Sequence, residues 1–315
     1  TRIALVCAVI MSIVFCTAKA QRIDMPDGEA IVSVNTFTGS EVYRLISTKT
    51  TIYSSKLLKG VWSKGKQLYQ TIPARKIVDA VFKSGDVGDS RNYAVLLDNG
   101  ETIVFSYNGK IDDFFELKFY GTPVQYLGNS SFRKILFADV ISVQFGSSVY
   151  RNLLNGSAWK QDTAGLGKLS IADITLDKFG VVLAATNKGL WKFDSGISSW
   201  MQIGAEKDTL SVSSVFCTRN GKMYAGMATK GIWMSSDNGV TWLRDSTGSG
   251  SVTISRFGDD TSSAVYATTG SNNSQLFRKL NGANSWERID AGLRSFAGMQ
   301  QIRITDISGE STLEL

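Results

Sequence analysis

Two doublets of adjacent carboxylates are the clearest candidates for acid–base chemistry in this 315-residue sequence. A glycoside hydrolase needs a general acid and a second carboxylate around the scissile bond, and Asp112-Asp113 and Asp259-Asp260 supply carboxylates in pairs. Adjacent side chains of a strand point to opposite faces, however, and both doublets stand beside turn-forming residues. We therefore interpret all four as solvated turn acids and predict no catalytic residues.

The residue types that are missing restrict other chemistry. The sequence contains no histidine, which excludes Ser-His-Asp catalysis and histidine-ligated zinc or iron. Cys217 is the one cysteine beyond residue 20, and its neighbours Val215 and Phe216 favour a small buried side chain over a nucleophile. No G-x-x-x-x-G-K-[ST] phosphate loop is present. We expect neither a metal nor a cofactor.

The elements that must position any functional residue are short strands joined by glycine turns. The sequence has 30 glycines and 3 prolines, and it is 43% hydrophobic. Residues 232–234 and 240–242 are predicted strands on either side of Asp237-Asn238-Gly239. These three residues favour a tight turn, because Asp and Asn bond to nearby backbone and Gly accepts a positive φ.

Weaker copies of this hairpin recur along the chain. Each copy ends in a tryptophan, and the intervals between them are 41, 42 and 44 residues: Trp159, Trp200, Trp242 and Trp286. Further alternating strands precede each hairpin, as at 171–176 and 181–185. Four strands in each period of about 42 residues indicate a β-propeller blade. The predicted fold class is therefore all-β, a β-propeller whose terminal aromatics pack between adjacent blades.

Six four-stranded blades and the start of a seventh can be placed on the sequence. Their approximate ranges are 28–72, 73–118, 119–163, 164–204, 205–245, 246–290 and, for the partial blade, 291–315. Either a seven-bladed ring is cut short, or the strands after Ile302 complete the ring with the N-terminal region. Residues 21–315 are predicted to form this single domain, with six or seven blades.

The first twenty residues have the features of a signal peptide. Arg2 precedes an apolar segment from Ile3 to Phe15, and Ala18-Lys19-Ala20 places small residues at positions −3 and −1 of a cleavage site. The apolar segment is shorter than the ~20 residues of a membrane helix. We predict an exported protein, secreted or periplasmic, with no membrane span after cleavage.

One copy of the hairpin carries a known motif. Ser235-Ser-Asp-Asn-Gly-Val-Thr-Trp242 is a full match to the Asp-box, S-x-D-x-G-x-T-W, and the chain resembles the Asp-box (BNR-repeat) β-propellers of the sialidase-like superfamily. The other copies depart from the motif: one keeps Asp194, Gly196 and Trp200 with an extra residue, and two place Asn155 and Asn281 where Asp is expected but retain Trp159 and Trp286. The resemblance implies that the box, with Ser235, Asp237, Gly239 and Trp242, is a structural hairpin on the face away from an active site.

The resemblance also defines what a sialidase would need. Members with that activity have an Arg-Ile-Pro start, an arginine triad, a Tyr–Glu nucleophile pair and an aspartic acid/base. Here Ile72-Pro73 follows Thr71 instead of arginine, and no Tyr–Glu pair is identifiable. Arg75, Arg133 and Arg256 stand near blade starts, and their convergence on the axis is one hypothesis for a ligand site.

Three lysines form a second candidate site. Lys49, Lys188 and Lys230 occupy equivalent turns before the third strands of blades one, four and five. These turns lie opposite the Asp-boxes, so the lysines could attract an acidic protein or glycan. The alternative interpretation is that Thr-Lys-Gly simply makes a good exposed turn.

The leading hypothesis is an exported, non-catalytic propeller that binds a protein or glycan through this face. A formal charge of +6 permits an acidic partner but is also ordinary for solubility, and we expect no nucleic-acid partner. The alternatives are a divergent, sialidase-like glycoside hydrolase and an assembly or stability factor for a protein complex.

Overall fold

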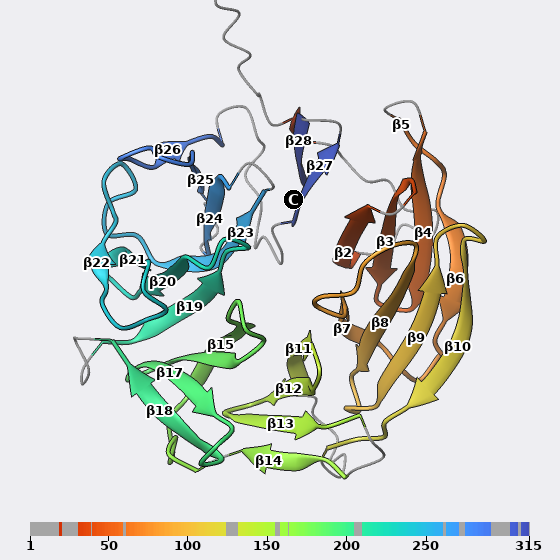
Figure 1. Cartoon of the computed structure of the whole chain (residues 1–315), viewed down its shortest axis with the longest axis horizontal. Coiled ribbons are helices and arrows are strands. Elements are labelled where there is room, and N and C mark those ends of the chain that lie inside the picture. Colours follow the sequence, from red (N-terminus) through yellow and green to blue (C-terminus); the bar gives the residue numbers. More distant parts are fainter. Residues whose placement is uncertain are drawn as a thin grey trace, which may run out of the picture.

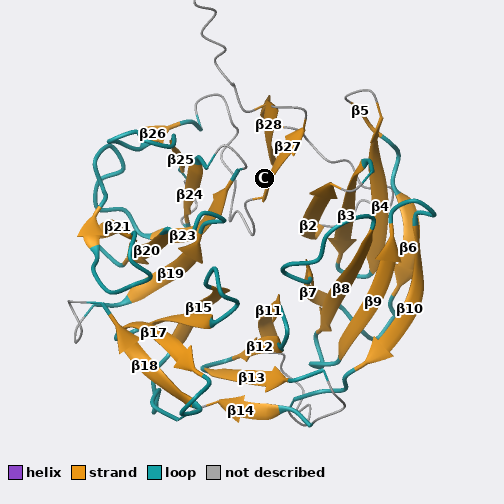
Figure 2. Cartoon of the chain, in the orientation of Figure 1, coloured by secondary structure: helices purple, strands orange, loops and turns teal. Residues whose placement is uncertain are grey.

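The structure is a computed structural model that describes most of the chain. The described residues are 19–20, 31–38, 40–58, 61–123, 132–154, 158–162, 164–204, 210–260, 263–270, 275–290, 303–307 and 310–314. They form strands, turns and loops (Figure 2), which confirms the all-β prediction. No helix in these residues is long and apolar enough to cross a membrane.

The strands of the described residues form seven sheets arranged in a ring (Figure 1). Sheet 1 contains β2 (Ile31–Thr38), β3 (Val42–Thr48) and β4 (Thr51–Leu58), with β5 (Val61–Trp62) and β6 (Lys66–Gln70) both paired to β4. Sheet 2 contains β7 (Ile77–Phe82), β8 (Ser90–Leu97), β9 (Thr102–Asn108) and β10 (Asp113–Phe119). Sheet 3 contains β11 (Phe132–Phe137), β12 (Ile141–Phe145), β13 (Ser148–Asn152) and β14 (Lys160–Asp162).

The next three sheets repeat the same antiparallel order. Sheet 4 contains β15 (Ile171–Leu176), β16 (Val182–Thr186), β17 (Gly189–Asp194) and β18 (Ser199–Ile203). Sheet 5 contains β19 (Val212–Cys217), β20 (Met223–Met227), β21 (Gly231–Ser235) and β22 (Leu243–Arg244). Sheet 6 contains β23 (Ile254–Asp259), β24 (Val265–Thr269), β25 (Leu276–Lys279) and β26 (Glu287–Arg288). In each of the six sheets the first strand is innermost, as Figure 1 shows.

Sheet 7 closes the ring from both ends of the chain. It contains β27 (Arg303–Ile307), β28 (Glu310–Glu314) and β1 (Lys19–Ala20), with β1 parallel to β28. The innermost strands contact one another in sequence around the ring, and β27 contacts both β23 and β2. Of the two sequence-based alternatives, the structure therefore has the C-terminal strands completing a ring. Residues 19–20, assigned above to the signal peptide, belong to this sheet, while residues 1–18 lie outside the described part.

The first strand of each of sheets 1 to 6 has a register shift at the same place, just after its first residue. The unpaired positions are Val32, Val78, Arg133, Ala172, Ser213 and Ser255. Such bulges bend a strand and increase its twist. In sheets 2 and 4 the residue after the unpaired position is a buried aspartate, Asp79 or Asp173. Its carboxylate accepts a hydrogen bond from a backbone amide of the next sheet.

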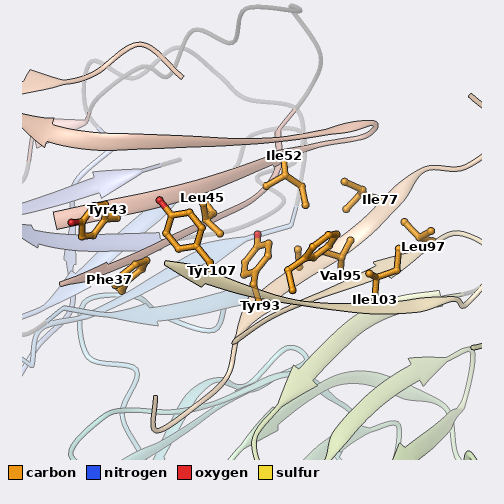
Figure 3. Close-up of a cluster of buried hydrophobic side chains, with 12 residues drawn as sticks. Phe37, Tyr43, Leu45, Ile52, Ile77, Tyr93, Val95, Leu97, Ile103 and Tyr107 are labelled. Carbon is orange, nitrogen blue, oxygen red and sulfur yellow. The ribbon is translucent and has the colours of Figure 1, made fainter. Parts of the chain in front are cut away.

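The hydrophobic core is divided into clusters that lie between neighbouring sheets. The cluster of sheets 1 and 2 includes Tyr43, Tyr93 and Tyr107, all fully buried (Figure 3). The fit is tight, because a Cβ placed on Gly109 would lie 2.7 Å from the Tyr43 ring. A single sheet leaves its two apolar faces in water, and each of sheets 2 to 5 buries both faces in clusters shared with its neighbours.

The repeated tryptophans lie between sheets, as the sequence predicts. Trp200, Trp242 and Trp286 are buried in the clusters shared with the preceding sheets, and half-buried Trp159 packs against another. Three of the indole N–H groups also donate to a carbonyl at the end of the preceding sheet: Trp159 to Tyr120 (2.7 Å), Trp200 to Asp162 (3.0 Å) and Trp286 to Asp245 (2.7 Å). Each of these three tryptophans therefore joins two sheets by packing and by a hydrogen bond, whereas Trp242 joins its two sheets by packing alone.

Candidate functional site

The alternating strand directions give the ring two faces that are built from different classes of turn. Turns between second and third strands, and the connections from one sheet to the next, share one face, which we term the connection face. Turns between first and second strands and the hairpins between third and fourth strands share the other, the hairpin face. Any site made by several sheets therefore draws on one class of turn.

The three predicted lysines lie at exposed turn tips on the connection face. In sheet 4 the Thr186 hydroxyl donates to the Gly189 carbonyl (2.8 Å) and accepts from the Lys188 amide (3.1 Å). In sheet 1 the Thr48 hydroxyl donates to the Thr51 carbonyl (3.3 Å) and accepts from the Thr51 amide (3.1 Å). A buried threonine thus fixes each turn and leaves Lys188 or Lys49 at its tip.

The third lysine turn is held differently. Thr229 and Gly231 have positive φ values of 65° and 77°, and the Lys230 amide donates to the Met227 carbonyl (3.1 Å). Lys230 is nevertheless exposed at the corresponding position of sheet 5. The structure therefore places the lysines in equivalent turns of three sheets.

Further basic residues lie in the connections of the same face. Lys76 and Lys168 are exposed and Arg75 is half-buried, with its Nη1 donating to the Ala74 carbonyl (3.4 Å). The acids in the described turns and connections of this face are Asp98, Glu101, Asp245 and Asp290. Two of them are paired: Asp245 with Lys279, and Asp290 with Arg288. Lys76 and Lys168 were not predicted, although their positions near the starts of the predicted blades 73–118 and 164–204 were a usable signal.

The three candidate arginines come from different structural contexts. Arg133 is exposed on β11 at its register shift, and Arg256 is half-buried on β23, where its Nη1 donates to the Ser255 carbonyl (2.7 Å). Both strands are innermost, whereas Arg75 precedes β7 in a connection. Convergence of the three on the axis stays a prediction.

The Asp237 hairpin is a self-contained turn on the hairpin face. The Asp237 carboxylate accepts from the Thr241 amide (2.8 Å), from the Thr241 hydroxyl and from the Ser235 hydroxyl (2.8 Å). These hydrogen bonds, first those from Thr241, lower the pKa of Asp237 to about 2. Asn238 and Gly239 have positive φ, and the Trp242 indole donates to the Gly239 carbonyl (3.1 Å). The carboxylate therefore braces the turn through three hydrogen bonds.

The degenerate copies preserve less of this network. Asp194 accepts from the amides of Gly196 (2.8 Å) and Ile197 (3.3 Å). Asn281 is exposed on its hairpin, and Asn155 lies outside the described residues. Turn bracing by the side chain therefore extends to the copy at Asp194.

Both carboxylate doublets lie where a strand meets a turn of the hairpin face, with Asp113 in β10 and Asp259 in β23. Asp112 accepts from the Tyr107 hydroxyl (2.6 Å), and Asp113 accepts from the Phe114 amide (2.8 Å). Asp260 accepts from the Ala264 amide (2.7 Å), while the adjacent Asp259 accepts from the Arg219 amide (2.8 Å). Burial raises the pKa of Asp259. The four carboxylates make structural bonds, and the prediction that they are simply solvated is wrong for Asp259 and Asp260, whose side chains are buried.

The remaining reactive side chains form no cluster. Burial raises the pKa of the half-buried Cys217 thiol, which disfavours the nucleophilic thiolate. In the described part of the chain no group of three or more Cys, Asp or Glu residues could hold a metal ion.

A small cleft opens on the hairpin face between sheets 5 and 6. Its volume is about 270 Å³, and its wall includes Asn220, Lys222, Tyr224, Asn281 and Asn284. Burial, with smaller contributions from Asp245 and Asp259, raises the pKa of Tyr224 to about 12. No sequence pattern indicated this cleft, because its two walls come from different repeats.

Comparison with known proteins identifies the fold. No protein-family model and no curated protein matches the chain. Among solved structures, YCF48 bound to a D1 peptide has a TM-score of 0.59 at 12% identity, with 93% of each chain covered. A mitotic checkpoint complex contains a similar chain, with a TM-score of 0.61, 14% identity and coverage of 94% of this chain and 93% of that one.

An enzyme is also among the similar structures. Virginiamycin B lyase from Staphylococcus aureus has a TM-score of 0.58 at 11% identity, covering 83% of this chain and 85% of the lyase. At these identities the likeness shows a β-propeller fold alone. The finer assignment to the Asp-box propellers remains a proposal that rests on residues 235–242.

Proposed function

We propose that this chain is a non-catalytic, Asp-box β-propeller that binds an acidic segment of a partner protein through its connection face. The observation that carries the proposal is the placement of Lys49, Lys188 and Lys230 at equivalent exposed turns of one face. Lys76 and Lys168 add positive charge in the connections of that face. An electropositive rim attracts acidic ligands and speeds their encounter.

The scaffold suits a binding function. The threonine bonds of the Lys49 and Lys188 turns fix the backbone before any ligand arrives, which reduces the entropy that binding must overcome. Two of the similar folds are recorded with partners: YCF48 with a D1 peptide, and the other within a mitotic checkpoint complex. We further propose that the protein is exported, on the basis of the apolar segment Ile3 to Phe15 and the small residues after it.

The test is the affinity of a labelled peptide that contains a run of glutamates. Replacing Lys49, Lys188 and Lys230 together by alanine should weaken binding roughly 3- to 140-fold, since each exposed ion pair contributes about 0.2–1 kcal/mol. Binding should also weaken as salt is added, less steeply for the triple variant.

The control variant replaces three exposed lysines of the hairpin face, Lys64, Lys110 and Lys178, by alanine. It changes the net charge equally and should leave the affinity nearly unchanged. An equal loss of peptide affinity in the two triple variants would mean that net charge alone attracts the peptide. Equal binding of a peptide with glutamines in place of glutamates would likewise overturn the proposal.

A further inference from the structure

The outer edge of sheet 2 exposes a long apolar strand. β10 is the edge strand of its sheet, and Phe115, Leu117 and Phe119 are 57%, 44% and 66% exposed. By contrast, the outermost strands of sheets 3, 5 and 6 have 3, 2 and 2 residues, and those of sheets 1 and 4 have 5 each. Short edges discourage pairing between chains, whereas the regular part of β10 after its register shift, residues 116–119, offers a template for it.

The free backbone groups of this edge can be assigned from its pairing with β9. The Tyr120 amide donates to the Thr102 carbonyl (2.9 Å), so in the regular ladder beyond it Lys118 and Glu116 direct their backbone groups toward β9. Leu117 and Phe119 alternate with them and direct their N–H and C=O groups outward. A further antiparallel strand can therefore bond to these two residues.

The sequence of the edge is complementary to itself in one antiparallel register. When Leu117 lies opposite Leu117 of a second copy, Glu116 faces Lys118 of that copy, and the exchange occurs twice because of the two-fold symmetry. Phe119 then lies opposite Phe115, the residue at which β10 has its register shift against β9. Within one copy Glu116 and Lys118 already form an ion pair (3.0 Å), which shows that both lie on one side of the sheet.

The neighbouring registers are unfavourable. In one shifted register, Leu117 lies opposite Phe115 of the second copy and the outward backbone groups still pair. Glu116 then faces Glu116 of the second copy. In the register shifted the other way, Leu117 lies opposite Phe119 of the second copy. Lys118 then faces Lys118 of the second copy. Like charges directly across a strand pair are destabilising, so charge selects the register centred on Leu117.

We propose that two copies of this chain pair through antiparallel β10 strands, centred on Leu117, to form a continuous sheet across a two-fold axis. Leu117 and Phe119 lie opposite Phe105 and Ile103 of β9, on the side of the core between sheets 1 and 2. Pairing extends this apolar surface into the second copy and removes it from water. The interface is separate from the connection face and does not depend on the ligand proposed above.

Sedimentation velocity over a range of protein concentrations tests the proposal by a charge exchange. Glu116→Lys places lysine against Lys118 of the other copy, and Lys118→Glu places glutamate against Glu116. Each single variant should associate about 10-fold more weakly than the wild type. An equimolar mixture of the two variants restores both opposite-charge contacts and should form a heterodimer at least as strong as the wild-type dimer.

Controls separate pairing from folding. Leu117→Lys should abolish association, whereas Leu243→Lys, at a 67% exposed residue on the outermost strand of sheet 5, should leave it intact. Unchanged circular dichroism would show that each variant is folded. A wild type that remains monomeric, or a mixture that associates no better than its two components, would overturn the proposal; so would association that survives Leu117→Lys.

Discussion

Asp237 illustrates how a residue suited to chemistry can be committed to structure. Its carboxylate accepts hydrogen bonds from the amide and hydroxyl of Thr241 and from the hydroxyl of Ser235. These donors favour the ionised form and hold the pKa at about 2, below the ordinary 3.8. A carboxylate with that pKa stays ionised at neutral pH, so it cannot serve there as a general acid.

The same pKa shift predicts a pH dependence of stability. Because the folded-state pKa is lowered, the stabilisation by Asp237 is complete above the unfolded pKa of about 3.8 and is lost as pH falls through about 2. Asp237→Asn should therefore lower the free energy of unfolding at neutral pH. The difference from wild type should shrink between pH 4 and pH 2, measured by urea unfolding. A difference that is constant across this range would show that the turn, not the charge, carries the effect.

At the scale of the strand, the residue that follows the register shift of an innermost strand can make hydrogen bonds to the neighbouring sheet. Asp173 accepts from the Ile174 amide (2.9 Å) in its own strand and from the Val215 amide (3.2 Å) in the next sheet. Lys134 of the preceding sheet adds an ion pair to the same carboxylate (2.8 Å). Asp79 repeats the two amide bonds, to Ala80 (2.9 Å) and Ile135 (3.1 Å). One buried carboxylate thus links the innermost strands of successive sheets.

Removing this link should be costly. Asp173→Ala leaves buried amides without an acceptor, and an unsatisfied buried group costs about 1–3 kcal/mol. We expect a loss of unfolding free energy in that range or above it, measured in urea, with Asp79→Ala behaving alike. Asp194→Ala, at a half-exposed hairpin residue, is the matched control and should cost less. Equal losses at Asp194 and Asp173 would contradict a special role for the inter-sheet bonds.

These elements also show what the sequence can and cannot predict. The spacing of Trp159, Trp200, Trp242 and Trp286 was enough to place the sheets, because one large buried ring per repeat is a local and periodic requirement. The register shift has no such signature, since its unpaired residue is valine, arginine, alanine or serine. The amide partners of Asp79 and Asp173 belong to other repeats, so only the folded ring reveals that these residues are buried and bonded.

At the scale of the whole molecule, ring closure makes the two faces possible. β27 contacts both β2 and β23, so the innermost strands form an unbroken circle and every sheet presents its turns in the same sense. The turn lysines were identifiable from sequence because equivalent turns follow from the repeat. Lys76 and Lys168 lie in connections of variable length, and the cleft between sheets 5 and 6 needs two repeats side by side.

The central claim is that the connection face binds the partner. Hydrogen exchange measured with and without the glutamate-containing peptide tests it most directly, because exchange reports which amides the ligand protects. We predict slower exchange in the lysine turns at residues 48–51, 186–189 and 227–231, with no change in the hairpins at 235–242 and 280–286. Protection confined to those hairpins, or protection in neither group while the peptide is bound, would contradict it.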